Sequence, residues 1–112
     1  MATDRLRGHL RTLVLAIIAA REPIHGYGLI AELRAASDGH LSLNEGAVYP
    51  ALHQLEADRL ILSTVDDSTG RRRRCYSLTN AGKTALVDEA TDWAEFRDAV
   101  DATLKEIPWL TN

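Results

Sequence analysis

Three segments in the first half of the chain carry apolar residues at helical spacing. In the first, they form one stripe that should end near Arg21, because Pro23 disfavours helix in the residue before it. A second predicted helix follows "HGYG" and stops at "SDGH", where Gly39 suits a helix end. A third begins at Asn44, a good N-cap, and ends around Asp58. The first stripe consists of Leu6, Leu10, Leu13, Val14, Ile17 and Ile18.

The pattern changes after the third helix. "RLILSTV" has the β-branched and apolar content of a strand, "DDSTG" is typical of a turn, and "RRRRCYSL" suits a returning strand. These segments predict a β-hairpin with a charged tip. Three helices followed by a hairpin is the order of a winged helix-turn-helix, a mainly α fold whose third helix enters the major groove of DNA.

The last segment predicts a long helix that has Thr79 as its N-cap and runs to Ile107, ahead of Pro108. Gly82 weakens its first turn, but apolar residues beyond it recur at steps of three and four. Such a helix extends about 40 Å, more than a small three-helix domain covers. The apolar face from Trp93 onward therefore needs another surface, which a second copy of the chain supplies. The seam consists of Leu86, Ala90, Trp93, Phe96, Val100, Leu104 and Ile107.

Charge is unevenly distributed over the 112 residues, whose net charge is −3. Residues 1–78, the predicted DNA-binding domain, hold ten Lys/Arg and nine Asp/Glu, a net of +1. Residues 79–112, the predicted dimerisation helix, hold three and seven, a net of −4. A charged hairpin tip by itself is typical of a solvated turn that blunts an edge strand. After this helix order, four consecutive arginines favour contact with DNA phosphates: Arg71, Arg72, Arg73 and Arg74.

The composition also bounds the setting. The longest apolar run, residues 13–20, is too short for a bilayer, which takes about 20 residues. No small-residue cleavage site follows the N-terminal segment. We therefore expect a soluble, cytoplasmic protein with no membrane partner.

Few residues offer catalytic or metal chemistry. No Gly-rich phosphate loop, G-x-S-x-G motif or convincing carboxylate pair is present, so we expect no enzyme. His9, His25, His40 and His53 form no i, i+4 pair and have no cysteine at ligand spacing, which disfavours a metal site and leaves no expected cofactor. The single Cys75 stands among arginines that favour its thiolate, so a redox sensor and a structural cysteine both remain open.

Three stretches match one family pattern in order and spacing. "HGYGLIAEL" contains a His-Gly-Tyr motif, "LNEGAVYPALHQLEADRLI" contains Gly-x-x-Tyr-Pro-x-Leu-x-x-Leu, and "GRRRRCYSLTNAGKTAL" joins an Arg-rich wing to Tyr-x-Leu-Thr. Together they resemble the PadR family of bacterial transcriptional regulators, over residues from about 6 to 110. The resemblance, closest to the short subgroup with one C-terminal helix, implies a homodimeric DNA-binding repressor commonly relieved by a small molecule. A MarR-like or ArsR-like regulator shares much of the architecture, but the Gly-x-x-Tyr-Pro motif favours a PadR-like one.

Residues 44–49, at the start of the third helix, are the predicted DNA-reading segment. Gly46 permits close backbone approach, and Glu45 either reads a cytosine amino group or caps the helix. Tyr49 either donates its hydroxyl to a phosphate or packs against the second helix, and the alternative is a core aromatic with a satisfied hydroxyl. Tyr27 either contacts the DNA backbone, as the resemblance implies, or packs beneath the third helix. The predicted DNA-binding residues are Tyr27, Asn44, Glu45, Gly46, Ala47, Tyr49, Arg71, Arg72, Arg73 and Arg74.

Pro50 interrupts the amphipathic pattern of the third helix. We expect it early enough in the helix that few N–H groups there have intrahelical partners. It then stiffens the junction between the presented turn and the packed remainder. A simple kink is the alternative.

Trp93 is the candidate for ligand binding. The resemblance implies that a tryptophan in this region can line a cavity between subunits and stack on flat aromatic ligands. Asp92 and Glu95 nearby suit a cationic effector. An ordinary interface anchor is the alternative. Phe96 and the first-helix residues Leu10 and Val14 are the expected neighbours of Trp93. The predicted ligand or dimer-interface residues are Leu10, Val14, Trp93, Phe96, Val100 and Leu104.

Two functions follow from these patterns. The first is a dimeric repressor that binds double-stranded DNA at a near-palindromic operator, because two-fold symmetry repeats the half-site. The second is a winged-helix module that binds a partner protein. Such a module has no need of four consecutive arginines, which favours DNA.

Overall fold

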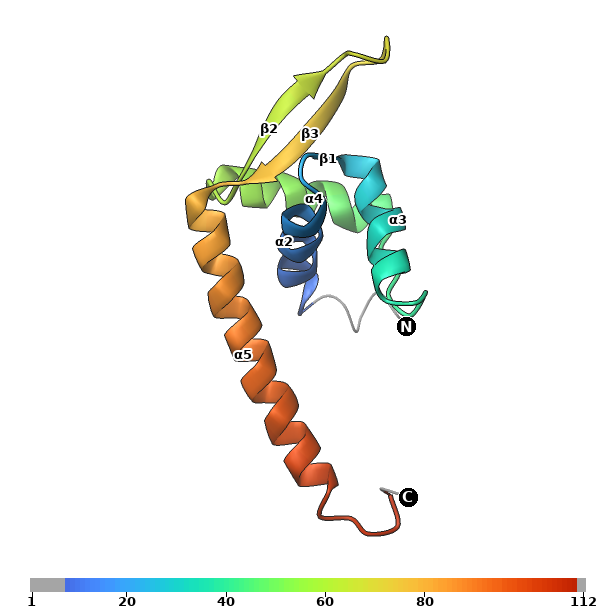
Figure 1. The fold of residues 1–112 in the computed structure, drawn as a ribbon, viewed down its shortest axis with the longest axis vertical. Coiled ribbons are helices and arrows are strands. Elements are labelled where there is room, and N and C mark those ends of the chain that lie inside the picture. Colours follow the sequence, from blue (N-terminus) through green and yellow to red (C-terminus); the bar gives the residue numbers. More distant parts are fainter. Residues whose placement is uncertain (1–7, 111–112) are drawn as a thin grey trace.

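The computed structural model describes residues 8–110, which form an elongated molecule of 58 × 27 × 20 Å (Figure 1). A head of helices and strands continues into one long helix that extends away from it. This arrangement confirms the predicted winged-helix fold with a long C-terminal helix; Leu6 lies outside the described residues. The elements are α2 (Leu10–Arg21), β1 (Ile24–His25), α3 (Gly26–Ala36), α4 (Glu45–Ala57), β2 (Ile61–Asp66), β3 (Arg73–Leu78) and α5 (Asn80–Leu104).

The core of the head lies where α2, α3 and α4 meet the sheet. Each helix contributes the apolar residues of one face, as helical spacing requires. The sheet adds side chains from β2 and β3, and the loop before α4 adds Leu43. Within the described residues, no helix is both long and apolar enough to cross a membrane. The most deeply buried side chains are Val14, Leu15, Ile18, Leu29, Val48, Leu52, Leu55 and Ile61.

Both predicted N-caps are confirmed. The Asn44 side chain accepts a hydrogen bond from the backbone N–H of Ala47 at 2.9 Å. The Thr79 hydroxyl accepts one from the N–H of Gly82 at 3.0 Å. Each cap satisfies a backbone donor that has no partner within its helix, so the starts of α4 and α5 follow from local sequence.

The sheet has a third strand that the sequence pattern did not predict. Strand order is β1-β3-β2, with both pairings antiparallel, so β3 lies in the centre. His25 of β1 pairs with Cys75 of β3, and Thr64 of β2 pairs with the same cysteine. Two residues are too few to show a period of two, which explains why β1 was missed. The consequence is that the base of the hairpin is joined to the start of α3.

The first turn of α5 lies directly against Arg59 and Leu60, the residues between α4 and β2. Thr79 donates its backbone N–H to the Leu60 carbonyl at 3.0 Å and its hydroxyl to the Arg59 carbonyl at 2.8 Å. A Cβ on Gly82 would overlap that Leu60 carbonyl oxygen. Gly82 is therefore required for close approach, and its low helix propensity is secondary. The helix ends at Leu104, three residues before the predicted end.

The explanation predicted for Pro50 is wrong. Pro50 is the sixth residue of α4, which begins at Glu45, so it lies beyond the unpaired first-turn donors. In a regular helix its N–H would bond to the Gly46 carbonyl, and proline cannot supply that bond. The helix nevertheless continues to Ala57. The consequence is that the Gly46 carbonyl, in the exposed first turn, lacks the donor that a regular helix would give it four residues on.

Candidate nucleic-acid interface

The first turn of α4 presents polar backbone and side chains to solvent. Asn44, Glu45 and Gly46 are exposed, whereas Val48 is fully buried beneath them and anchors the turn. A Cβ on Gly46 would lie 3.3 Å from the Asn44 cap oxygen, so glycine leaves the cap undisturbed. Ala47 is half-buried and gives the capped N–H. The turn is thus held rigid while its outer face remains free to contact a partner.

Tyr49 lies between the two roles predicted for it. Its side chain packs against the start of α3, because a Cβ on Gly26 would lie 3.1 Å from Tyr49 Cε1 and 3.6 Å from its hydroxyl. The residue is nevertheless 37% exposed. The glycine of the His-Gly-Tyr motif therefore makes room for the tyrosine of the Gly-x-x-Tyr-Pro motif. Tyr49 is therefore not a fully buried core residue, although one edge of its ring packs on α3.

Tyr27 connects the start of α3 to the wing, which we define as β2, β3 and the turn 67–72. Tyr27 is 57% exposed, so it does not pack beneath the third helix. Its hydroxyl accepts a hydrogen bond from Arg73 Nη1 at 3.0 Å, and the Arg73 guanidinium carbon lies 5.9 Å from the ring centroid. Arg73 Nη2 donates to Thr69 Oγ1 at 3.1 Å. One arginine thus joins the wing turn to the helix start.

The four arginines do not form one uniform patch. Arg71 and Arg72 are exposed in the turn, whereas Arg73 and Arg74 lie in β3 and point to opposite faces, as successive strand residues do. Arg74 Nη1 donates to Ser63 Oγ at 2.9 Å, and that hydroxyl donates to Glu56 of α4 at 2.7 Å. Within residues 8–110, Arg71 and Arg72 at the tip of the wing make no side-chain hydrogen bond or ion pair, whereas Arg73 and Arg74 at its base are held by neighbouring side chains.

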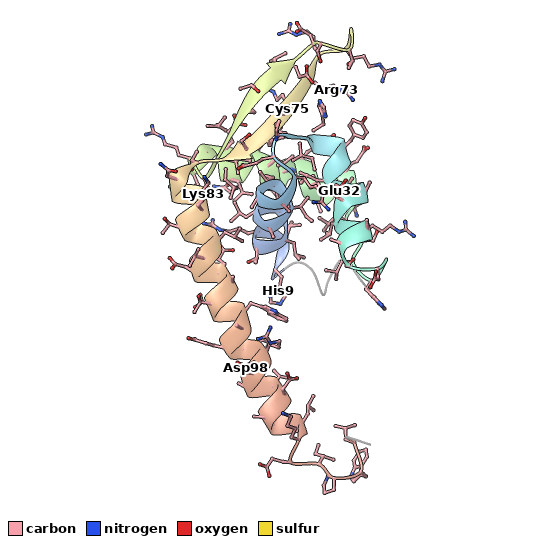
Figure 2. All side chains as sticks on the ribbon, in the orientation of Figure 1. His9, Glu32, Arg73, Cys75, Lys83 and Asp98 are labelled. Atoms are coloured by element: carbon pink, nitrogen blue, oxygen red, sulfur yellow. The ribbon has the colours of Figure 1, made fainter. Side chains whose placement is uncertain are left out.

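A hollow of about 650 Å³ lies between α2 and α5, and we call it the α2–α5 hollow. Its aromatic wall is formed by His9 and Trp93, whose rings meet edge to face at 5.2 Å, and by Phe96, 6.1 Å from Trp93. Figure 2 shows His9 at the N-terminal end of α2, facing the middle of α5. Trp93 is 45% exposed. The lining residues are Gly8, His9, Thr12, Leu13, Leu41, Glu89, Asp92, Trp93 and Phe96.

The other wall of the α2–α5 hollow is acidic. Glu89 accepts hydrogen bonds from Arg11 Nε at 2.9 Å and from Thr12 Oγ1 at 2.6 Å, which join α5 to α2. Asp92 lies one turn of helix further along and also lines the hollow. Arg11 balances the charge of Glu89, so the carboxylate that suits the aromatic hollow to a flat cation is that of Asp92.

The α2 neighbours predicted for Trp93 need correction. Val14 is only 1% exposed and belongs to the core, and Leu10 packs against that core. Neither lines the hollow, because both side chains pack in or against the core. The lining residues on this side are His9, the N-cap of α2, with Thr12 and Leu13, of which only Leu13 belongs to the predicted apolar stripe. Of the other predicted residues, Val100 and Leu104 are exposed further along α5.

Comparison with known proteins agrees with this architecture. The sequence profile of the "Transcriptional regulator PadR-like family" matches residues 14–88. The chain belongs to the PadR-like family of transcriptional regulators. It is 41% identical over 71 residues to transcriptional regulator Rv3488 of Mycobacterium tuberculosis, a match that covers 63% of this chain and 64% of that relative.

Solved structures of PadR-like proteins show the same fold. A PadR-like transcriptional regulator from Bacillus cereus superposes with a TM-score of 0.77 at 28% identity, over 90% of this chain and 96% of that one. A PadR family transcription regulator from Clostridium difficile gives 0.75 at 30% identity, over 87% and 99%. The fold of this PadR-like regulator, including its single long helix after the wing, is therefore that of the family.

This PadR-like regulator also has a cluster that sequence spacing did not reveal. His25 of β1, Asp66 of β2 and Cys75 of β3 bring a ring nitrogen, a carboxylate oxygen and a sulfur within 4.8 Å of one another. His25 Nε2 lies 3.2 Å from Asp66 Oδ2, and Cys75 Sγ lies 3.9 Å from the same oxygen. Spacing along one helix was the wrong criterion, because strand pairing assembles the three. Figure 2 shows Cys75 and Arg73 on the side of β3 near the start of α3.

Asp66 is oriented by the wing turn. Its Oδ1 accepts hydrogen bonds from the hydroxyl of Ser68 at 2.7 Å and from the backbone N–H of Ser68 at 3.0 Å. These two bonds, with the His25 contact next, lower the pKa of Asp66 to about 2. The carboxylate is therefore charged at neutral pH, and its second oxygen is directed at His25 and Cys75.

Proposed function

We propose that this PadR-like regulator is a homodimeric DNA-binding repressor whose operator affinity is lowered by a planar, cationic small molecule. The first turn of α4 enters the major groove, and the wing contacts the adjacent backbone. Residues 79–112 provide the dimer contact, and the ligand binds in the α2–α5 hollow beside it. One observation supports the DNA-binding part most directly. The exposed, capped start of α4 accompanies a wing whose tip exposes Arg71 and Arg72.

The contacts of the head support a reading role for α4. Val48 and Tyr49 fix the first turn to the core and to α3, so little ordering remains to oppose binding. The Gly46 carbonyl, which receives no N–H bond from Pro50, and the exposed Glu45 side chain can accept from groove-edge donors such as a cytosine amino group. Arg71 and Arg72 supply the phosphate contacts that position the helix.

The exposed face of α5 supports dimerisation. Phe96 is 59% exposed, and Val100 and Leu104 lie one and two turns further along the same face. A single chain leaves this face in water, and a two-fold contact between two copies buries it. Symmetry then places two recognition helices against one duplex. The expected operator is near-palindromic, with half-sites about one helical turn or a multiple apart.

The ligand part of the proposal rests on the position of the α2–α5 hollow. The hollow lies between α2, a helix of the head, and the part of α5 where the predicted dimer face begins. A ligand that inserts between Trp93 and the acidic wall changes the angle between head and helix, and with it the spacing of the two α4 helices. Binding therefore shifts the population between operator-competent and incompetent dimers.

The test of DNA binding is a fluorescence-anisotropy titration against DNA from upstream of the protein's own gene, beside a scrambled duplex, at several salt concentrations. Tight, sequence-selective binding is expected. Arg72→Ala should weaken binding to both duplexes and lower the slope of log K against log salt by about 0.9, because one phosphate contact is lost. Arg97→Ala is the matched control, since it removes the same charge from an exposed arginine on α5.

Each outcome of this titration has a definite meaning. An unchanged slope in Arg72→Ala removes the wing tip from the interface. An equal loss in Arg97→Ala shows that net charge alone is responsible. Absence of binding to either duplex at low salt replaces the repressor with the protein-interaction module.

The test of ligand binding uses tryptophan fluorescence. A planar aromatic cation such as ethidium should bind the protein in the absence of DNA and quench Trp93. Trp93→Ala should weaken this binding about tenfold, because stacking and cation–π attraction contribute about 1–2 kcal/mol. Trp109→Ala removes the exposed second tryptophan and should leave the affinity for the cation unchanged. Equal losses in both variants would place the ligand elsewhere.

A further inference from the structure

The base of the wing holds three different metal-ligand types at one point. The sheet supplies one from each strand: His25 from β1, Asp66 from β2 and Cys75 from β3. Strand pairing fixes their relative positions, because His25 and Cys75 are direct partners across β1 and β3. We propose that these three side chains bind one divalent transition-metal ion of the zinc class.

The distances suit tetrahedral coordination. Metal–ligand bonds of about 2.0–2.3 Å to nitrogen, oxygen and sulfur place neighbouring ligand atoms about 3.3–3.7 Å apart. The histidine-to-carboxylate separation is 3.2 Å and the cysteine-to-carboxylate separation is 3.9 Å. The remaining separation is at most 4.8 Å, so it must shorten by no more than about 1 Å to reach a tetrahedral edge.

The donor set selects the class of metal. Sulfur and imidazole nitrogen with a single carboxylate oxygen suit zinc, cobalt or cadmium, whereas magnesium and calcium prefer oxygen ligands alone. On binding, neutral His25 gives the lone pair of Nε2 and the ionised Asp66 gives one from Oδ2. Cys75 gives its thiol proton to the solvent and binds as thiolate. Two negative ligands then balance the two positive charges of the ion.

The surroundings provide support and access. Ser68 holds Asp66 Oδ1 with two hydrogen bonds and so fixes the carboxylate, as outer partners of metal ligands do. The side chains of His25 and Asp66 are 27% and 30% exposed, which gives the ion a path and leaves water for a fourth position. Cys75 lies beneath them, 8% exposed. The positive charge of Arg73 would repel the ion, but hydrogen bonds to Tyr27 and Thr69 hold its guanidinium group.

The experiment is metal binding by the full-length reduced protein, without DNA, so that it does not depend on the proposed function. Zinc is titrated in competition with a chromophoric chelator, and cobalt is used for its spectrum. We expect one ion per chain and a near-ultraviolet thiolate-to-cobalt charge-transfer band. Cys75→Ser and Asp66→Asn should each weaken zinc binding more than roughly tenfold, since even partners outside the ligand shell contribute 10–100-fold.

His40→Gln is the matched control, because it removes an exposed potential ligand outside the cluster. It should bind zinc as the unmodified protein does. The proposal is overturned if zinc does not bind, if Cys75→Ser and Asp66→Asn both bind it unchanged, or if His40→Gln loses as much affinity. A cobalt complex without a thiolate band also overturns it, and that spectrum is read on the unmodified protein, independent of whether any variant folds.

Discussion

The two halves of α5 have the same apolar spacing but opposite environments. In the proximal half, residues 80–92, Gly82 is buried against Leu60, and Leu86 packs against the core. In the distal half, residues 93–104, the apolar face is exposed, with Phe96 at 59% and Leu104 at 43%. Figure 1 shows why, because the head ends beside the first half and the helix continues beyond it. Periodicity thus shows that a helix has an apolar face and leaves open what covers it.

We expect the largest loss of stability when the contact between Gly82 and Leu60 in the proximal half is disrupted. Gly82→Ala should destabilise the protein by about 3 kcal/mol, because its Cβ would overlap the Leu60 carbonyl oxygen, which belongs to the backbone and cannot rotate away. Urea denaturation followed by circular dichroism measures the change. Gly28→Ala is the control, since its Cβ would meet Ile24 at an ordinary 3.6 Å. It should be neutral or slightly stabilising. Equal stability of the two variants would show that α5 does not lie this close to Leu60.

The next effect concerns the distal half. Val100→Glu with Leu104→Glu should raise the dimer dissociation constant at least roughly a hundredfold, because each charge enters the proposed two-fold contact twice. Sedimentation velocity at several concentrations measures this. Unfolding of the monomer should change by only about 0.5 kcal/mol, since neither side chain contacts the core.

The control for that pair lies on the opposite face of the same helix. Thr91→Glu with Ala102→Glu adds the same charge at exposed positions about half a turn away from the seam. These changes should leave the dimer intact. A dimer that survives the Val100 and Leu104 changes would contradict the assignment of the distal half as its interface.

We expect the smallest change in stability from removing the N-cap of α5. Thr79→Ala should cost about 1 kcal/mol of unfolding free energy, because it removes the cap on Gly82 and the bond to Arg59. Thr91→Ala removes a hydroxyl bonded only within α5, to the Val87 carbonyl. It should change stability by less than about 0.5 kcal/mol. Thermal denaturation compares the two, and similar losses would show that the cap does not anchor α5.

Contacts between distant segments changed several interpretations of single residues. The run of four arginines suggested one patch, but the alternation of β3 separates Arg73 from Arg74 and joins them to different neighbours. Val14 was expected beside Trp93, yet the orientation of α2 directs it into the core. Gly82 was interpreted through helix propensity, although the approach of Leu60 explains it. For Val14 and Gly82, the deciding contacts are with segments distant in the chain.

The sequence by itself determined the helices, their caps at Asn44 and Thr79, the hairpin and the family, because these depend on side chains a few residues apart. Only the tertiary structure decided the third strand and the cluster of His25, Asp66 and Cys75, whose members are 41 and 9 residues apart along the chain. Pairing across a sheet depends on how separate segments meet, and no local period records it. The apolar face of α5 follows from local periodicity and was therefore predictable, whereas what covers each part of that face depends on how distant segments pack.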